Sequence, residues 1–148
     1  MKDIKAIKSF VNVTNISDED VGLEHVASLR LKLANLYQSQ QNDHLSVNVP
    51  YNVWRQEANW KTYKMSDIGF EKYSNGLTKR FAVSNTGRWS TKSYLPMGAF
   101  ENSETKETFL WQIESNGSWA WELTDTNGAF CLVATGPEEH DHSWHKEL

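Results

Sequence analysis

Apolar and polar residues alternate with a period of two along much of this chain, and that alternation limits its fold more than any other feature. The odd positions from Val21 to Leu33 are mostly apolar and the even positions mostly polar. A strand with one buried face shows this pattern, whereas a helix needs a period of about 3.6. A weaker stripe runs from Ile7 to Val13, and the polar stretch Asn15–Asp20 joins the two. We therefore predict an antiparallel hairpin over residues 7–33.

A second run of alternation lies nearer the C-terminus. Phe109–Ile113 and Trp119–Leu123 flank a segment containing Asn116-Gly117. Asn-Gly is a strong hairpin signal because both residues tolerate positive φ. After another turn at Asp125–Gly128, Ala129–Thr135 reads as a third strand. The segment from 109 to 135 therefore predicts a three-stranded meander.

The middle of the chain is less regular, but it still favours strands. Leu45–Trp54 has strand composition, and its Pro50 must lie at an edge or a bend because proline donates no backbone hydrogen bond. Strands spaced about ten residues apart indicate an all-β, antiparallel sandwich with few or no helices. Residues 1–148 are expected to form one domain. The remaining predictions are short strands at Trp60–Met65 and Arg80–Ser84, a helical turn at Ser66–Phe70, and an ordered loop at Asn85–Pro96.

Composition excludes several classes of function. The net charge is −4, so the chain lacks the basic surface that nucleic-acid binding needs. The single cysteine, Cys131, permits no internal disulfide, and it lies in an apolar strand where we expect a buried thiol. No apolar run suits a membrane span or a leader peptide, so a cytoplasmic location is expected. The seven tryptophans fit sheet cores, and exposed ones fit stacking on sugar rings.

The best binding candidate is an irregular stretch that follows a proline. Trp54 offers a flat apolar face, while Asn52, Arg55 and Glu57 offer hydrogen-bonding groups for sugar hydroxyls. Alternatively, Trp54 packs inside the sandwich together with Trp60.

A second aromatic loop, Gly87–Lys92, is interpreted as an ordered loop whose Trp89 caps the core. The alternative is that it lines a subsite or a subunit contact.

Two other groups of ionisable residues are interpreted as solvated surface rather than as catalytic or metal sites. Glu114 and Glu122 are expected on facing strands of the Asn-Gly hairpin, where a solvated strand face is favoured over a catalytic pair. The acidic and histidine-rich segment Glu138–His145 is interpreted as a solvated turn rather than a zinc site. We therefore expect no catalytic residue, no metal and no cofactor in this chain.

Five collinear segments resemble the N-terminal β-supersandwich domain of family 36 glycoside hydrolases, the α-galactosidase group. They are Val13–Leu29, Tyr51–Trp60, Ser84–Pro96, Trp111–Trp119 and Gly136–Trp144. The resemblance covers nearly the whole chain and the later part of that domain, so the chain is expected to be a fragment of a longer protein.

In that family a catalytic barrel follows this domain and carries the aspartate nucleophile and the aspartate acid/base. The resemblance implies a non-catalytic domain that packs on the barrel, with Trp54 helping to close the galactose subsite. The implied partners are the barrel, a galactoside or other carbohydrate, and further copies of the chain in a homo-oligomer. A free-standing carbohydrate-binding module and a purely structural sandwich are the alternatives.

Overall fold

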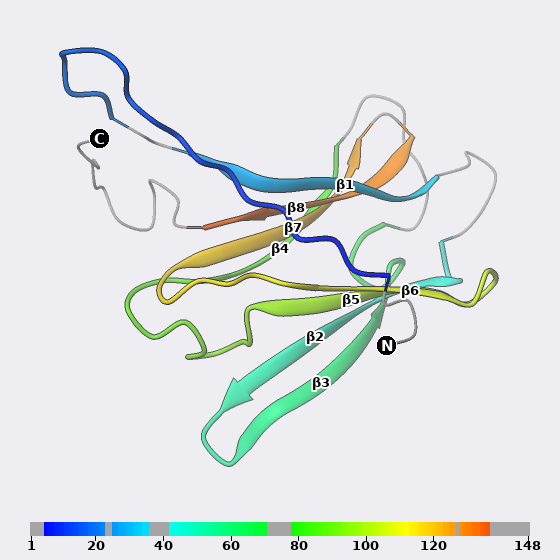
Figure 1. The fold of residues 1–148 in the computed structure, drawn as a ribbon. Helices are drawn as coiled ribbons and strands as arrows, with labels where there is room; N and C mark the ends of the chain where they lie inside the picture. The colour runs from blue at the N-terminus through cyan, green and yellow to red at the C-terminus, as the bar shows by residue number, and fades with distance from the viewer. Residues whose placement is uncertain (1–4, 23–24, 36–41, 71–77, 127, 137–148) are drawn as a thin grey trace.

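The computed structural model describes residues 5–22, 25–35, 42–70, 78–126 and 128–136. Eight strands and no helix occur in these ranges, which confirms the all-β, antiparallel prediction (Figure 1). The strands are β1 (Ala27–Asn35), β2 (Leu45–Val53), β3 (Gln56–Lys64), β4 (Arg80–Asn85), β5 (Met97–Asn102), β6 (Glu107–Gln112), β7 (Trp119–Thr126) and β8 (Ala129–Thr135).

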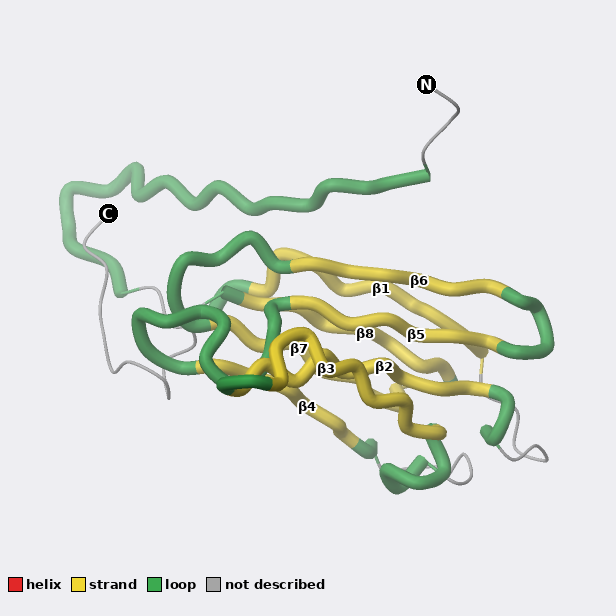
Figure 2. Tube along the Cα trace, turned by 90° about the horizontal axis from the view of Figure 1, so that it is seen from below, coloured by secondary structure: helices red, strands yellow, loops and turns green. Residues whose placement is uncertain are grey.

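The strands form two four-stranded sheets. Sheet A has the order β1-β8-β7-β4 and sheet B the order β3-β2-β5-β6. Figure 1 shows the sheets stacked as two layers. In Figure 2 the N-terminal segment runs along the side of the sandwich where β1 and β6 lie. The fold is therefore a sandwich whose core lies between the two sheets.

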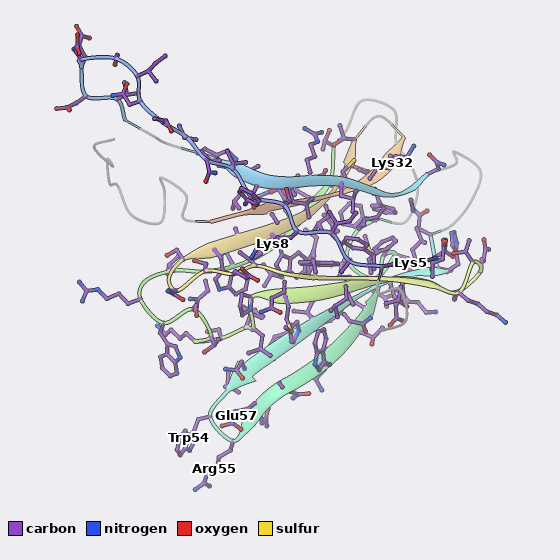
Figure 3. The ribbon with its side chains drawn as sticks, viewed as in Figure 1. Lys5, Lys8, Lys32, Trp54, Arg55 and Glu57 are labelled. Carbon is purple, nitrogen blue, oxygen red and sulfur yellow. The ribbon has the colours of Figure 1, made fainter. Side chains whose placement is uncertain are left out.

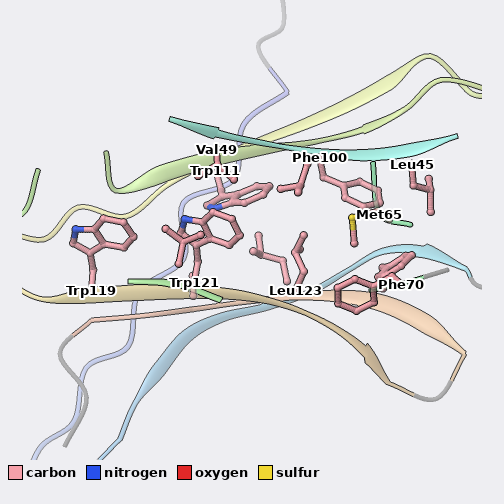
Figure 4. Packing of buried hydrophobic residues seen from close by; sticks show 14 residues of the cluster. Leu45, Val49, Met65, Phe70, Phe100, Trp111, Trp119, Trp121 and Leu123 are labelled. Atoms are coloured by element: carbon pink, nitrogen blue, oxygen red, sulfur yellow. The ribbon is translucent and has the colours of Figure 1, made fainter. Parts of the chain in front are cut away.

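The core consists of the inward-facing residues of both sheets. Trp119, Trp121 and Leu123 alternate on β7 and are almost fully buried. They face sheet B, which contributes Leu45 and Val49 (Figure 4). The period-two spacing of these three large apolar residues marks the buried face of β7 in the sequence.

The predicted hairpin over residues 7–33 is wrong. Residues 5–22 form no strand, and β1 begins only at Ala27 and pairs with β8. The N-terminal segment touches β1 through the Ser9 hydroxyl, which donates to the Ser28 carbonyl. Ile7 and Phe10 are 85% and 69% exposed. A period-two stripe identifies an apolar face but does not say which strand lies beside it.

The Asn-Gly hairpin is also wrong, and so is the three-stranded meander. β6 pairs with β5 in sheet B, while β7 pairs with β4 and β8 in sheet A. Neither Asn116 nor Gly117 has the positive φ that the tight hairpin turn requires. Instead, the Ser115 side chain donates to the Ser118 carbonyl and accepts from the Gly117 amide. The segment thus carries the chain from one sheet to the other.

The β7–β8 half of the meander is confirmed. Its turn places Gly128 at a φ of 74°, which favours glycine. Residues 66–70 form successive turns rather than a helical turn, with Gly69 at a φ of 93°.

Pro50 lies where pairing of β2 with β5 has ended, two residues beyond Asn48. Its carbonyl accepts from the Leu95 amide of a loop, so the missing proline N–H interrupts no strand ladder.

Candidate functional site

The tip of the β2–β3 hairpin projects from the sandwich. Trp54 and Arg55 form its turn, and Arg55 adopts a φ of 65°. Trp54 is 85% exposed, so the alternative that it packs in the core is wrong. Figure 3 shows the side chains of Trp54, Arg55 and Glu57 together at this tip. Three of the four residues predicted to bind substrate therefore share one exposed end of the molecule.

The tip combines an aromatic face with a donor and an acceptor. A Glu57 carboxylate oxygen accepts from the Arg55 amide at 3.2 Å, which ties the carboxylate to the turn. The Arg55 guanidinium supplies N–H donors, and the Glu57 carboxylate retains lone pairs for further hydrogen bonds. An indole face beside a donor and an acceptor is suited to a ligand that has one apolar face and a rim of hydroxyl groups.

Asn52, the fourth predicted residue, has a structural role instead. Its side-chain amide donates to the Thr91 carbonyl at 2.6 Å, and its side-chain oxygen accepts from the Ala58 amide at 3.2 Å. Its own backbone amide donates to the Ser93 carbonyl at 2.9 Å. Asn52 therefore joins the base of the hairpin tip to the loop between β4 and β5, and its amide is already engaged within the protein.

Asn52→Ala is expected to destabilise the fold by about 2 kcal/mol, because it removes two side-chain hydrogen bonds from a partly buried position. Urea denaturation followed by circular dichroism measures this. Glu57→Gln is the matched control, since it keeps an acceptor oxygen for the Arg55 amide and should change stability little. A wild-type denaturation midpoint for Asn52→Ala would contradict the structural role.

The β4–β5 loop carries a second exposed tryptophan. Trp89 is 65% exposed, so the interpretation that it caps the core is wrong. Its indole N–H donates to the Thr91 hydroxyl at 3.1 Å, and its carbonyl accepts from the Asn85 side chain at 2.6 Å. Trp119 is the indole buried beneath this loop, and it donates to the Ser90 carbonyl at 2.6 Å. The internal hydrogen bond of the Trp89 indole leaves its ring faces as the surface offered to a ligand.

Hydrogen bonds place Trp54 and Trp89 at the same end of the sandwich. Thr91 accepts from both Trp89 and Asn52, and Asn52 lies two residues before Trp54. Both tryptophans lie in polar, irregular segments of the sequence, where binding residues are often found.

Three tyrosines stiffen the base of the hairpin. The Tyr51 and Tyr63 hydroxyls lie 2.7 Å apart across β2 and β3. The Tyr51 ring packs against the Tyr94 ring with centroids 5.0 Å apart. The hydrogen bond with Tyr63, together with partial burial, raises the pKa of Tyr51 to about 12. Tyr51 therefore stays neutral and hydrogen-bonded to Tyr63 at ordinary pH.

The other sequence candidates do not assemble into a site. Glu122 lies on β7 of sheet A, whereas Glu114 lies two residues beyond the end of β6 of sheet B, so the two are not on facing strands. Glu114 pairs with Lys8 at 2.9 Å, and Glu122 pairs with Arg80. Cys131 is half-buried on β8 rather than enclosed in the core. Segment Glu138–His145 lies outside the described residues.

The described residues contain neither a metal-binding group nor a helix that could span a membrane. No group of His, Cys, Asp and Glu side chains there is arranged to hold a metal ion. Nor does any helix in those ranges have the length and apolar character needed to cross a bilayer. Comparison of the chain with protein-family models, with curated proteins and with solved structures found no match.

Proposed function

We propose that this chain is a non-catalytic domain of an α-galactosidase-like glycoside hydrolase, which packs on a catalytic barrel and helps to shape its sugar-binding pocket. The observation that carries the proposal is the 85% exposed Trp54 at the tip of a projecting hairpin, with Arg55 and Glu57 beside it. An exposed indole face beside a hydrogen-bond donor and an acceptor supports contact with a ligand that has an apolar face and hydroxyl groups. The resemblance to family 36 glycoside hydrolases is the basis for placing that contact, in this proposal, at the galactose subsite.

The outer face of sheet B supports the packing part of the proposal. Trp60 pairs in register with Pro50, and Leu110 pairs with Ala99. Pro50 and Ala99 point to the same outer face, because Ala99 pairs with Asn48, two residues before Pro50. Trp60 and Leu110 are nevertheless 41% and 62% exposed. Apolar side chains of this size, left open on one sheet face, suit a surface that another domain covers.

The carboxylates of the described residues argue against hydrolysis by this chain alone. A retaining glycosidase needs two carboxyl groups about 5–5.5 Å apart on either side of the scissile bond. Glu114 and Glu122 each pair with a cation and lie in or beside different sheets. The purified chain is therefore expected to show no turnover of a nitrophenyl α-galactoside. Turnover that disappears when one carboxylate is replaced would contradict this part of the proposal.

The test of Trp54 uses a longer chain in which the domain precedes its barrel. Trp54→Ala is expected to raise the KM for an α-galactoside about tenfold, because one aromatic contact with the sugar is lost. The thermal midpoint should stay unchanged, since Trp54 makes no core contact. Glu104→Gln, in the exposed β5–β6 turn, is the control and should leave KM unchanged. An unaltered KM in Trp54→Ala would remove Trp54 from the substrate pocket.

A free-standing carbohydrate-binding module is the second candidate, and one observation favours it. Trp54 and Trp89 are both exposed at the same end, which could allow two sugar contacts. Isothermal titration of the isolated chain with galacto-oligosaccharides separates the candidates. Binding that is lost in both Trp54→Ala and Trp89→Ala supports the module.

A further inference from the structure

The outer face of sheet A contains a pocket of about 340 Å³, on the other sheet from the hairpin tip. Its lining includes His25, Arg80 on β4, Ala120 and Glu122 on β7, and Thr135 on β8. The volume is at the lower end of the roughly 300–1,000 Å³ typical of small-molecule sites. It suits a single small ring rather than a polymer.

The floor of this pocket is built from small residues on neighbouring strands. Ala120 and Thr135 are register partners across β7 and β8, and both point away from the core. They are nevertheless only 6% and 3% exposed. Arg80, Glu122 and His25 line the same pocket and carry its longer polar side chains.

The charged residues at the rim are balanced. Glu122 accepts from the Nε of Arg80, and the Glu122 side chain is only 25% exposed. This bond uses one carboxylate oxygen and one of the guanidinium N–H groups, so the other oxygen can accept and the Nη groups can donate. Arg80 and Glu122 carry opposite charges, so this pair by its net charge favours neither an anion nor a cation. It presents donors and acceptors side by side, which matches the alternating hydroxyl groups of a neutral sugar.

We propose that this pocket binds a neutral monosaccharide or a small polyol, as a site separate from the hairpin tip. The second carboxylate oxygen of Glu122 accepts from one or two ligand hydroxyls, and the Nη groups of Arg80 donate to another ligand oxygen. The small side chains of Ala120 and Thr135 leave room for the ring. The inference does not rest on the proposed function, because it uses no residue of the Trp54 tip and holds for any parent protein.

The test is a heteronuclear NMR titration of the isotope-labelled chain with D-galactose, D-glucose and myo-inositol, each added alone. At least one probe is expected to shift the amide signals of Ala120, Glu122 and Thr135 in a saturable manner, while those of Trp54 and Arg55 stay in place. Glu122→Gln and Arg80→Gln are each expected to weaken this binding about tenfold, since each removes one charged hydrogen-bonding partner. Both positions are partly exposed, so the fold should survive, and unshifted core amides would verify it.

Matched controls distinguish this site from the tip. Glu57→Gln makes the same chemical change at the hairpin, and Trp54→Ala removes the tip aromatic, so neither should alter the response of Ala120 and Thr135. If no probe shifts these amides in the wild-type chain, or if both rim variants bind as the wild type does, the proposal is wrong. If Trp54→Ala abolishes the response, the sugar binds at the tip, which overturns this inference and supports the tip site instead.

Discussion

Gly98→Ala is expected to lower the free energy of unfolding by about 3 kcal/mol. A Cβ built on Gly98 would lie 2.5 Å from Cζ2 and 2.9 Å from Cε2 of the Trp111 indole. Trp111 is the register partner of Gly98 and is 5% exposed. Its ring packs edge-on against Trp121 with centroids 5.0 Å apart, so it has little room to withdraw. Urea denaturation followed by tryptophan fluorescence measures the loss.

Two further variants test whether the loss at Gly98 comes from the clash with the Trp111 indole. Gly136→Ala is the matched control, because an added Cβ there meets no atom within 4 Å, and stability should stay the same or rise slightly. Trp111→Leu in the Gly98→Ala background should recover part of the loss, since the two residues share one clash. A wild-type midpoint for Gly98→Ala would mean that the indole does not lie over this glycine.

Trp119→Ala is expected to destabilise the chain by about 4 kcal/mol. Trp119 is fully buried, and its indole N–H donates to the Ser90 carbonyl at 2.6 Å. The substitution leaves a large cavity and an unpaired carbonyl. Since a domain of this kind has a total stability of about 5–15 kcal/mol, the variant should be partly unfolded at modest urea concentrations. Circular dichroism across a urea series would show this.

Substitutions of other tryptophans test whether the loss of stability depends on the burial of Trp119 rather than on its being a tryptophan. Trp89→Ala removes an indole that is 65% exposed and should change stability by less than about 1 kcal/mol. Trp119→Phe should be worse tolerated than Trp121→Phe, because the Trp121 indole nitrogen has no hydrogen-bond partner among the described residues. Equal losses for the two phenylalanine variants would contradict the Ser90 hydrogen bond.

The sequence predicts the fold class well because period-two alternation is a local signal. Trp119, Trp121 and Leu123 mark one face of strand β7, so both its existence and its buried face follow from the sequence alone. The sequence does not predict β5, because Gly98 occupies an inward position and Phe100 alone marks the buried face of this six-residue strand. Without β5, the strand nearest to β6 that the sequence predicts is β7, and Asn116-Gly117 between them predicts a hairpin turn that the structure does not contain.

Part of the candidate site could be predicted because it also has a local signal in the sequence. Trp54 is predicted to bind a ligand because it lies in polar, irregular sequence beyond a proline. The sequence predicts that Asn52 binds a sugar because its side-chain amide can bond to hydroxyl groups. Its actual partners, Thr91 and Ala58, come close to it only through the tertiary structure, which no local pattern shows. The pocket on sheet A depends on strand register between β7 and β8, so no local pattern in the sequence could indicate it.

The β4–β5 loop couples the exposed hairpin tip to the protein core through two neighbouring residues. Ser90 holds the buried Trp119 indole, and the neighbouring Thr91 holds Asn52 beneath the hairpin tip. A single short piece of backbone thus connects the interior of one sheet to the exposed end of the other. Binding that shifts the tip is therefore expected to alter the hydrogen bond of the Trp119 indole and with it the fluorescence emission of Trp119.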